Sequence, residues 1–136
     1  MLAPAGVLVL FLLGALSVDS AVAFLAQRRL ADVAVAAAND AAGAGLDVDA
    51  LRRGGPGAEE ARIDPVLADR IARQVVAQAD LGGVRLDPAS VSVSVVGRRV
   101  TVRLAGTAEH VFASAVPGIT HTTPVHASAT AELRGG

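Results

Sequence analysis

The feature that most constrains this chain is an uncharged apolar run at residues 2–18, LAPAGVLVLFLLGALSV. A helix over these residues would be ~25 Å long, the short end of what crosses the hydrocarbon core of a bilayer. Asp19 interrupts the run, and the apolar pattern resumes over residues 20–26, SAVAFLA. We therefore predict a transmembrane anchor over residues 1–26, with Asp19 inside it.

Three interpretations of this run are open. An uncleaved anchor is favoured because Gly and Pro are absent from Ala15 to Ala42, so helix-forming sequence continues without a break. A cleaved signal peptide would use a small-x-small site, which Ala21-Val22-Ala23 supplies, but no basic residue precedes the apolar run. A buried helix of a soluble protein is the third interpretation.

The charges around the run bear on its orientation. Arg28 and Arg29 follow the run, and only the α-amino group precedes it. Taken alone, the positive-inside rule would place the C-terminal part of the chain in the cytoplasm. A carboxylate in or near the bilayer is costly, so Asp19 is a candidate for pairing with a positive group on a neighbouring helix. The alternative is that the span ends at Val18 and that Asp19 lies in the headgroup region.

Beyond Ala26 the sequence is amphipathic, and we expect one helix from about residue 5 to about residue 44. Its apolar positions follow helical spacing: Leu30, Val33, Ala34, Ala37, Ala41 and Ala44. We assign residues 27–46 to the part of the helix that leaves the membrane. Its small residues permit close helix packing, either against a second chain or against the same chain's sheet. These candidate packing residues are Ala34, Ala37, Ala38 and Ala41.

We expect residues 47–136 to form one small domain. A polar loop at residues 52–61 precedes a short second helix that begins at Asp64-Pro65, where Asp64 can cap the helix. Leu67, Ile71 and Val75 make its apolar stripe, flanked by Ala68, Ala72 and Val76. Gly82-Gly83 ends this helix.

The period then changes to two, which indicates strands. Val91, Val93 and Val95 alternate with serines, and Gly97-Arg98 fits a hairpin turn that leads to a strand over residues 100–104. Pro117-Gly118 marks another turn, and the last strand carries an apolar face from Val125 to Leu133. The predicted fold is α+β: a long N-terminal helix, a short second helix and a three-stranded antiparallel sheet with one covered face.

Residues with reactive or metal-binding side chains form no catalytic pattern. His110, His121 and His126 lack the spacing of a metal site, and the chain has no Cys. The serines at 90, 92, 94 and 128 alternate with apolar residues and are expected on solvated strand faces, without a GxSxG motif. The net charge is -1 and aromatic residues make up 2%, which argues against nucleic-acid binding. We expect no cofactor, no metal and no enzymatic activity.

The run LGALSVDSAVAFLAQRRLADVAVAAANDAAGAGLD resembles the N-terminal region of the TadE/TadG-like, pilin-like proteins of tight-adherence (Flp-type) pilus assembly. In that family an apolar helix contains an acidic residue and is followed by an Arg/Gln-rich step and an Ala/Asp-rich stretch. Here these elements are Asp19, the segment 27–29 and the segment 32–42. The C-terminal VTVRLAGTAEHVFASAVPG and VHASATAEL are similar to the family's ending.

The resemblance implies a single-pass protein of the cytoplasmic membrane whose C-terminal domain lies outside the cytoplasm. It also implies a minor pilin-like subunit or an assembly factor. Expected partners are membrane lipid, other pilus or secretion proteins, and oligomers formed through the N-terminal helix. Family members carry a short basic stretch before the helix, so we expect the natural start to lie upstream of Met1. The alternative is an exported α+β binding domain with a cleaved signal peptide.

Overall fold

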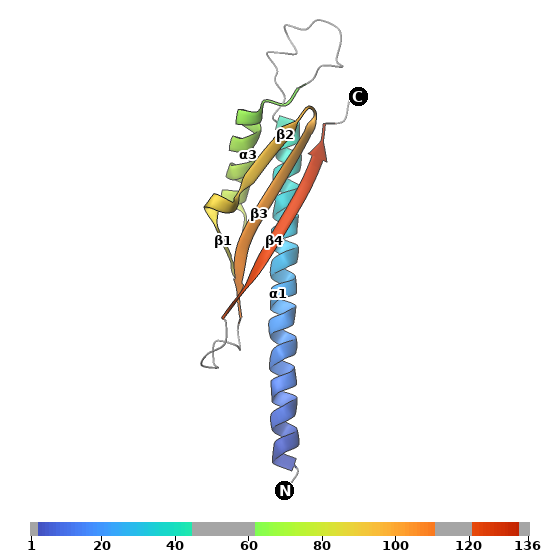
Figure 1. Ribbon diagram of the computed structural model, residues 1–136, viewed down its shortest axis with the longest axis vertical. Coiled ribbons are helices and arrows are strands. Elements are labelled where there is room, and N and C mark those ends of the chain that lie inside the picture. Colours follow the sequence, from blue (N-terminus) through green and yellow to red (C-terminus); the bar gives the residue numbers. More distant parts are fainter. Residues whose placement is uncertain (1–2, 45–61, 111–120, 134–136) are drawn as a thin grey trace, which may run out of the picture.

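The computed structural model describes residues 3–44, 62–110 and 121–133. The elements are α1 (Ala3–Ala44), α3 (Pro65–Gln78), β1 (Val84–Leu86), the 3-10 turn η2 (Pro88–Ser90), β2 (Ser92–Val96), β3 (Arg99–Glu109) and β4 (Thr122–Glu132). Figure 1 shows α1 as one long helix whose upper half carries the sheet and α3, while its lower half extends beyond them. The α+β class, the long N-terminal helix and the short second helix are confirmed.

The helix α1 runs unbroken for 42 residues, close to the predicted range of 5–44. Two serine hydroxyls in the apolar half form hydrogen bonds within the helix. Ser17 Oγ donates to the Leu13 carbonyl at 2.9 Å, and Ser20 Oγ donates to the Leu16 carbonyl at 2.8 Å. Such bonds to the preceding turn let a hydroxyl sit in an apolar helix without an unpaired donor.

The described residues form a sheet of four strands, where the sequence predicted three. Central β3 pairs with β4 over its whole length, while β1 and β2 share its other edge at opposite ends. The sheet is thus three strands wide, and the addition is β1, which is too short to show alternation in sequence. Gly106 permits this pairing, because a Cβ there would lie 2.6 Å from the Arg85 carbonyl oxygen.

Ser90 joins the two short strands to β3. Its hydroxyl oxygen accepts from the Ala105 N–H at 3.0 Å and lies 2.6 Å from the Ala105 carbonyl oxygen. The Asp87 N–H also donates to that carbonyl, at 3.2 Å. The prediction of a solvated strand position is therefore wrong for Ser90, which lies in η2 and takes the place of a missing strand neighbour. Ser92, Ser94 and Ser128 are exposed on strands as predicted.

The predicted start of the second helix and the predicted hairpin turn are confirmed. The predicted helix end at Gly82-Gly83 is wrong, because α3 already ends at Gln78, with the extended Ala79 as its C-cap. The Asp64 carboxylate accepts from the N–H groups of Val66 and Leu67, so Asp64 caps α3 with Pro65 at its start. Gly97 adopts a φ of 61° in the turn between β2 and β3, a conformation that glycine permits. The loop at 52–61 and the turn at Pro117-Gly118 lie outside the described residues.

One apolar core joins the upper half of α1, α3 and the inner face of the sheet. Leu30, Val100 and Val102 are its largest fully buried side chains. In α3 the most buried positions are Ala68, Ala72 and Val76, whereas the expected stripe at 67, 71 and 75 is half-buried. Ala44, expected on the apolar stripe of α1, is exposed because it lies at the helix end.

Candidate functional site

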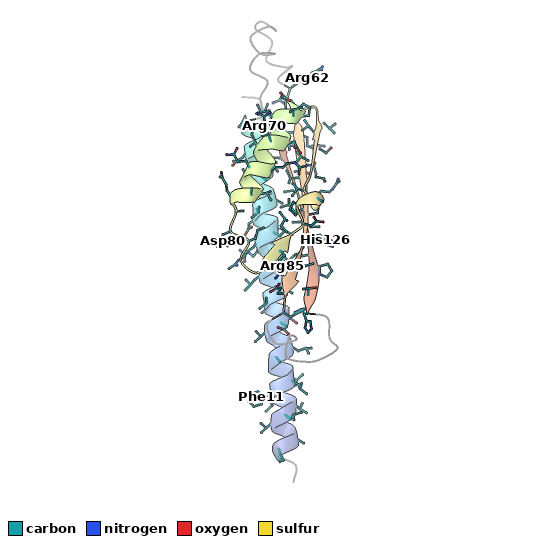
Figure 2. The ribbon with its side chains drawn as sticks, turned by 90° about the vertical axis from the view of Figure 1, so that its left-hand side faces the viewer. Phe11, Arg62, Arg70, Asp80, Arg85 and His126 are labelled. Atoms are coloured by element: carbon teal, nitrogen blue, oxygen red, sulfur yellow. The ribbon has the colours of Figure 1, made fainter. Side chains whose placement is uncertain are left out.

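The lower half of α1 presents apolar side chains to its surroundings. Among the described helices, one is long and apolar enough to cross a membrane: Pro4–Ala44 holds an 18-residue stretch with mean hydropathy 2.3, of which 0% is buried. Figure 2 shows the labelled Phe11 projecting from this half, far below the sheet. A core helix of a soluble protein would be covered, so the third interpretation does not fit. A membrane span and a signal sequence both fit this helix.

Asp19 lies where the exposed half of α1 meets the domain. It is half-buried, as are Ala15, Val22 and Ala23 on the same side of the helix. This row leads to Ala26, the first residue of α1 in the buried core. Asp19 therefore belongs to the side of α1 that continues into the domain.

The four alanines proposed for helix packing are all covered by this chain. Ala34, Ala37, Ala38 and Ala41 are at most 1% exposed and belong to the core cluster. Small side chains at these positions allow the helix to lie close to the sheet and α3. Of the two arrangements left open by the sequence, the structure shows the intramolecular one.

Gln27 connects α1 to the free edge of β4. Its amide nitrogen donates to the His126 carbonyl, and its amide oxygen accepts from the His126 N–H at 3.3 Å. β4 pairs only with β3 among the described strands, so its other edge presents backbone groups. Gln27 thus acts as one residue of an additional strand, a role that the sequence did not reveal.

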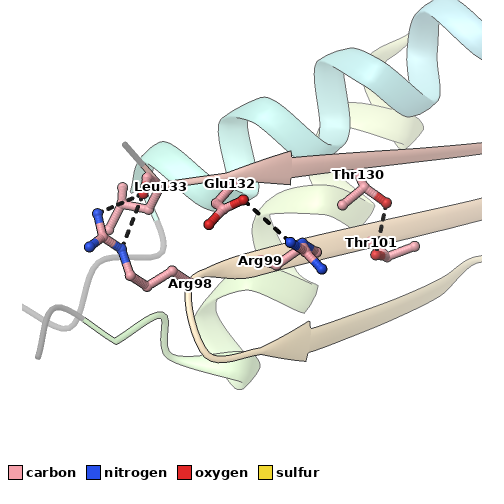
Figure 3. A network of polar contacts seen from close by, with 6 residues as sticks. All are labelled: Arg98, Arg99, Thr101, Thr130, Glu132 and Leu133. Atoms are coloured by element: carbon pink, nitrogen blue, oxygen red, sulfur yellow. Dashed lines mark hydrogen bonds and ion pairs between the residues drawn. The ribbon is translucent and has the colours of Figure 1, made fainter. Parts of the chain in front are cut away.

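An open groove of about 950 Å³ separates the upper ends of α1 and β4. Its described lining is Asn39, Ala42, Gly43, Arg98, Thr130, Ala131, Glu132 and Leu133. At its rim Arg98 donates to the Leu133 carbonyl at 2.7 and 3.2 Å, as Figure 3 shows. Two nitrogens of this guanidinium therefore bind the backbone at the end of β4.

The outer face of the sheet is polar and carries cross-strand pairs. Thr101 and Thr130 hydroxyls are 3.0 Å apart, and the Arg99 guanidinium lies 3.4 Å from the Glu132 carboxylate (Figure 3). Such exposed pairs contribute roughly 0.2–1 kcal/mol each. This face is thus exposed to solvent, and its cross-strand pairs help to fix the register of β3 and β4.

Arg73 ties α3 to the opposite edge of the sheet. Its guanidinium donates to the Asp69 carboxylate at 2.9 Å and to the Val91 carbonyl at 3.1 Å. The hydrogen bond and the charge of Asp69 raise the pKa of Arg73, which stays cationic. The contact fixes the position of α3 over β2 without creating a reactive group.

The histidines lie at the lower end of the sheet and along β4. The His110 N–H donates to the His121 carbonyl at 2.9 Å, and His110 Nε2 is 2.6 Å from Thr123 Oγ1. His126 is exposed on β4. Within the described ranges no three His, Cys, Asp or Glu side chains gather as a metal site would require.

The fold and its surfaces define a class of protein: a small α+β domain built on the upper half of one long helix whose lower half is apolar and exposed. This arrangement is pilin-like. Comparison of the chain with protein-family models, with curated proteins and with solved structures finds no match.

Proposed function

We propose that this chain is a membrane-anchored, pilin-like subunit or assembly factor of a tight-adherence (Flp-type) pilus or secretion system. The observation that carries the proposal is the uncovered apolar half of α1, continuous with the helix that forms the core of the domain. Such an arrangement couples a domain rigidly to a membrane segment. The resemblance of residues 13–47 to the TadE/TadG-like proteins is the reason for proposing this kind of assembly.

The proposed topology is a single span of the cytoplasmic membrane with the C-terminal domain outside. Arg28 and Arg29 alone would argue for the opposite orientation. Arg29, however, has a place in the domain: its guanidinium lies against Gly82, where an added Cβ would overlap it. Arg29 therefore has a structural reason to occur on this side of the apolar run.

Proposed partners are membrane lipid and other proteins of the pilus or secretion machinery. If copies associate through α1, the contact would use the exposed lower half, because the alanine positions of the upper half are covered. In bilayers, helices associate through packing and polar contacts between them. Asp19 is the proposed polar contributor. An Asp19→Asn chain that still supports assembly would argue against this role.

A reporter active only outside the cytoplasm, fused after Gly136, tests anchor and orientation together. Activity in the membrane fraction supports the proposal. Absence of activity, with the chain still in the membrane, would place the domain in the cytoplasm and reject the pilus role. Deletion of the gene in its native cell should then reduce surface fibres, and restoring the full chain should recover them.

An exported binding domain with a cleaved signal is the second candidate. It is supported by the position of the core: cleavage after Ala23 would leave every residue of the buried cluster in place, since that cluster begins at Ala26. Sequencing the mature N-terminus separates the two. Retention of residues 2–23 supports the anchor, whereas a chain starting at Phe24 and released from the membrane supports the exported domain.

A further inference from the structure

The packing of the sheet on α1 fixes how deeply the apolar helix can enter a bilayer. Gln27 is bonded to His126, and the groove near the upper ends of both elements is lined by Gly43 and Leu133. α1 and β4 therefore run in the same direction. Figure 1 shows the start of β4 beside the middle of α1.

The level of the lower sheet end on α1 follows from this register. From His126 back to Thr122 the strand covers about 13 Å at ~3.3 Å per residue. The same height corresponds to about nine residues of α1 at ~1.5 Å each. Counted down from Gln27, this places the first residue of β4 beside Val18 and Asp19.

The described residues at the lower end of the sheet include charged and polar side chains. Glu109, paired with Thr122 in register, forms an ion pair of 2.8 Å with Arg85, and the two side chains are 52% and 79% exposed. His110 and His121 follow at the same end. Charged groups in the hydrocarbon layer are costly, whereas the headgroup layer accommodates them.

This geometry conflicts with a hydrocarbon boundary at Ala26, where the apolar sequence ends. Between Val18 and Ala26 lie about 12 Å of helix. A boundary at Ala26 would immerse Glu109, which is level with Thr122, by about that depth, and Arg85, which is level with Pro124, by about half of it. The exposed apolar side chains of Phe24 and Leu25 do not require lipid, because isolated exposed apolar groups are common on protein surfaces.

We propose that the lower sheet end, with Arg85, Glu109, His110 and His121, rests on the lipid headgroups, and that the hydrocarbon ends near Val18. This inference rests on the proposed membrane anchor. The described residues 3–18 of α1 then span ~24 Å, at the short end of what crosses the hydrocarbon core of a bilayer. Asp19 then lies at the level of the headgroups, so a contact between Asp19 and a neighbouring helix would form in that layer and not in the hydrocarbon. The partner of this surface is the bilayer itself.

Single-cysteine labelling of the full chain tests the boundary, and the absence of native Cys gives a clean background. Leu16→Cys, Ser20→Cys and Phe24→Cys replace positions that are all exposed in the protein, so no part of the described chain shields them. Ser92→Cys, exposed on the sheet, is the control. The probe is a membrane-impermeant maleimide added to phosphatidylcholine/phosphatidylglycerol proteoliposomes opened by sonication.

We expect the cysteines at 20 and 24 to react within about threefold of the rate at 92, and the cysteine at 16 to react only after denaturing detergent. Protection at 20 and 24 with reaction at 92 would overturn the proposed boundary while leaving the anchor intact. Reaction at 16 without detergent, or loss of the chain from the vesicles, would instead reject the anchor.

Contact with headgroups is tested with a fluorophore at Thr122→Cys or, as control, at Thr130→Cys. The two positions are ~26 Å apart along β4, and both are exposed. We expect headgroup-spin-labelled lipid to quench the fluorophore at 122 at least twice as strongly as at 130. Equal, weak quenching would show that the domain stands clear of the bilayer and would overturn the proposal.

Discussion

The side chain of Gln27 forms two hydrogen bonds with the backbone of a single residue, His126, on a strand 99 residues away. The amide supplies one donor and one acceptor, as a residue of a neighbouring strand would. Pro124, two positions earlier on β4, has no N–H to present at an edge. Together these features reduce the length of β4 open to pairing with another chain.

Gln27→Ala should expose the His126 backbone to water and loosen this part of the edge. Because both groups become hydrated, the loss of unfolding free energy should be only about 0.5–1 kcal/mol. Hydrogen exchange at the His126 amide is the sensitive measurement and should accelerate. Gln27→Glu keeps the acceptor for that amide and should preserve protection; equal exchange in all three chains would contradict the role.

Ser90→Ala should remove the hydroxyl that serves both backbone groups of Ala105. The part-buried Ala105 N–H loses its partner, so we expect a loss of about 1–2 kcal/mol in denaturant unfolding. Ser94→Ala is the matched control, since Ser94 is exposed on β2, and it should change stability by less than about 0.5 kcal/mol. Equal effects would refute the special position of Ser90.

Ala37→Leu should overfill the contact between α1 and the domain. Ala37 is 0% exposed, so the larger side chain must displace its neighbours, at a cost of about 1–3 kcal/mol. Ala36→Leu places the same side chain on the exposed face of the same turn and should be nearly neutral. A neutral Ala37→Leu would mean that the covering of this helix face is loose.

Gly106→Ala should disturb the pairing of β1 with β3. The added Cβ would lie 2.6 Å from a backbone oxygen of β1, which cannot rotate away, so we expect a loss of about 1–3 kcal/mol. Gly43→Ala meets nothing within 4 Å in α1 and should be neutral or stabilising by up to about 1 kcal/mol. Thermal unfolding of both chains in the same detergent compares them directly.

Local patterns predicted most elements of this fold. The continuous helix follows from the absence of Gly and Pro between Ala15 and Ala42, and the start of α3 from Asp64-Pro65. The alternation of Val100, Val102 and Leu104 indicated the covered sheet face. β1 could not be predicted in this way, because three residues give no period and their pairing depends on the distant Gly106.

The sequence by itself determined the apolar helix, its amphipathic continuation and the single covered face of the sheet, because these depend on periodicity along the chain. The tertiary structure decided where the domain sits on the helix, through contacts such as Gln27–His126 between residues 99 apart in sequence. It also decided that the alanines at 34, 37, 38 and 41 face the domain instead of a second chain. A helix that packs on its own domain and a helix that packs on a second chain need the same pattern of small residues. Only the placement of the sheet distinguishes these two arrangements.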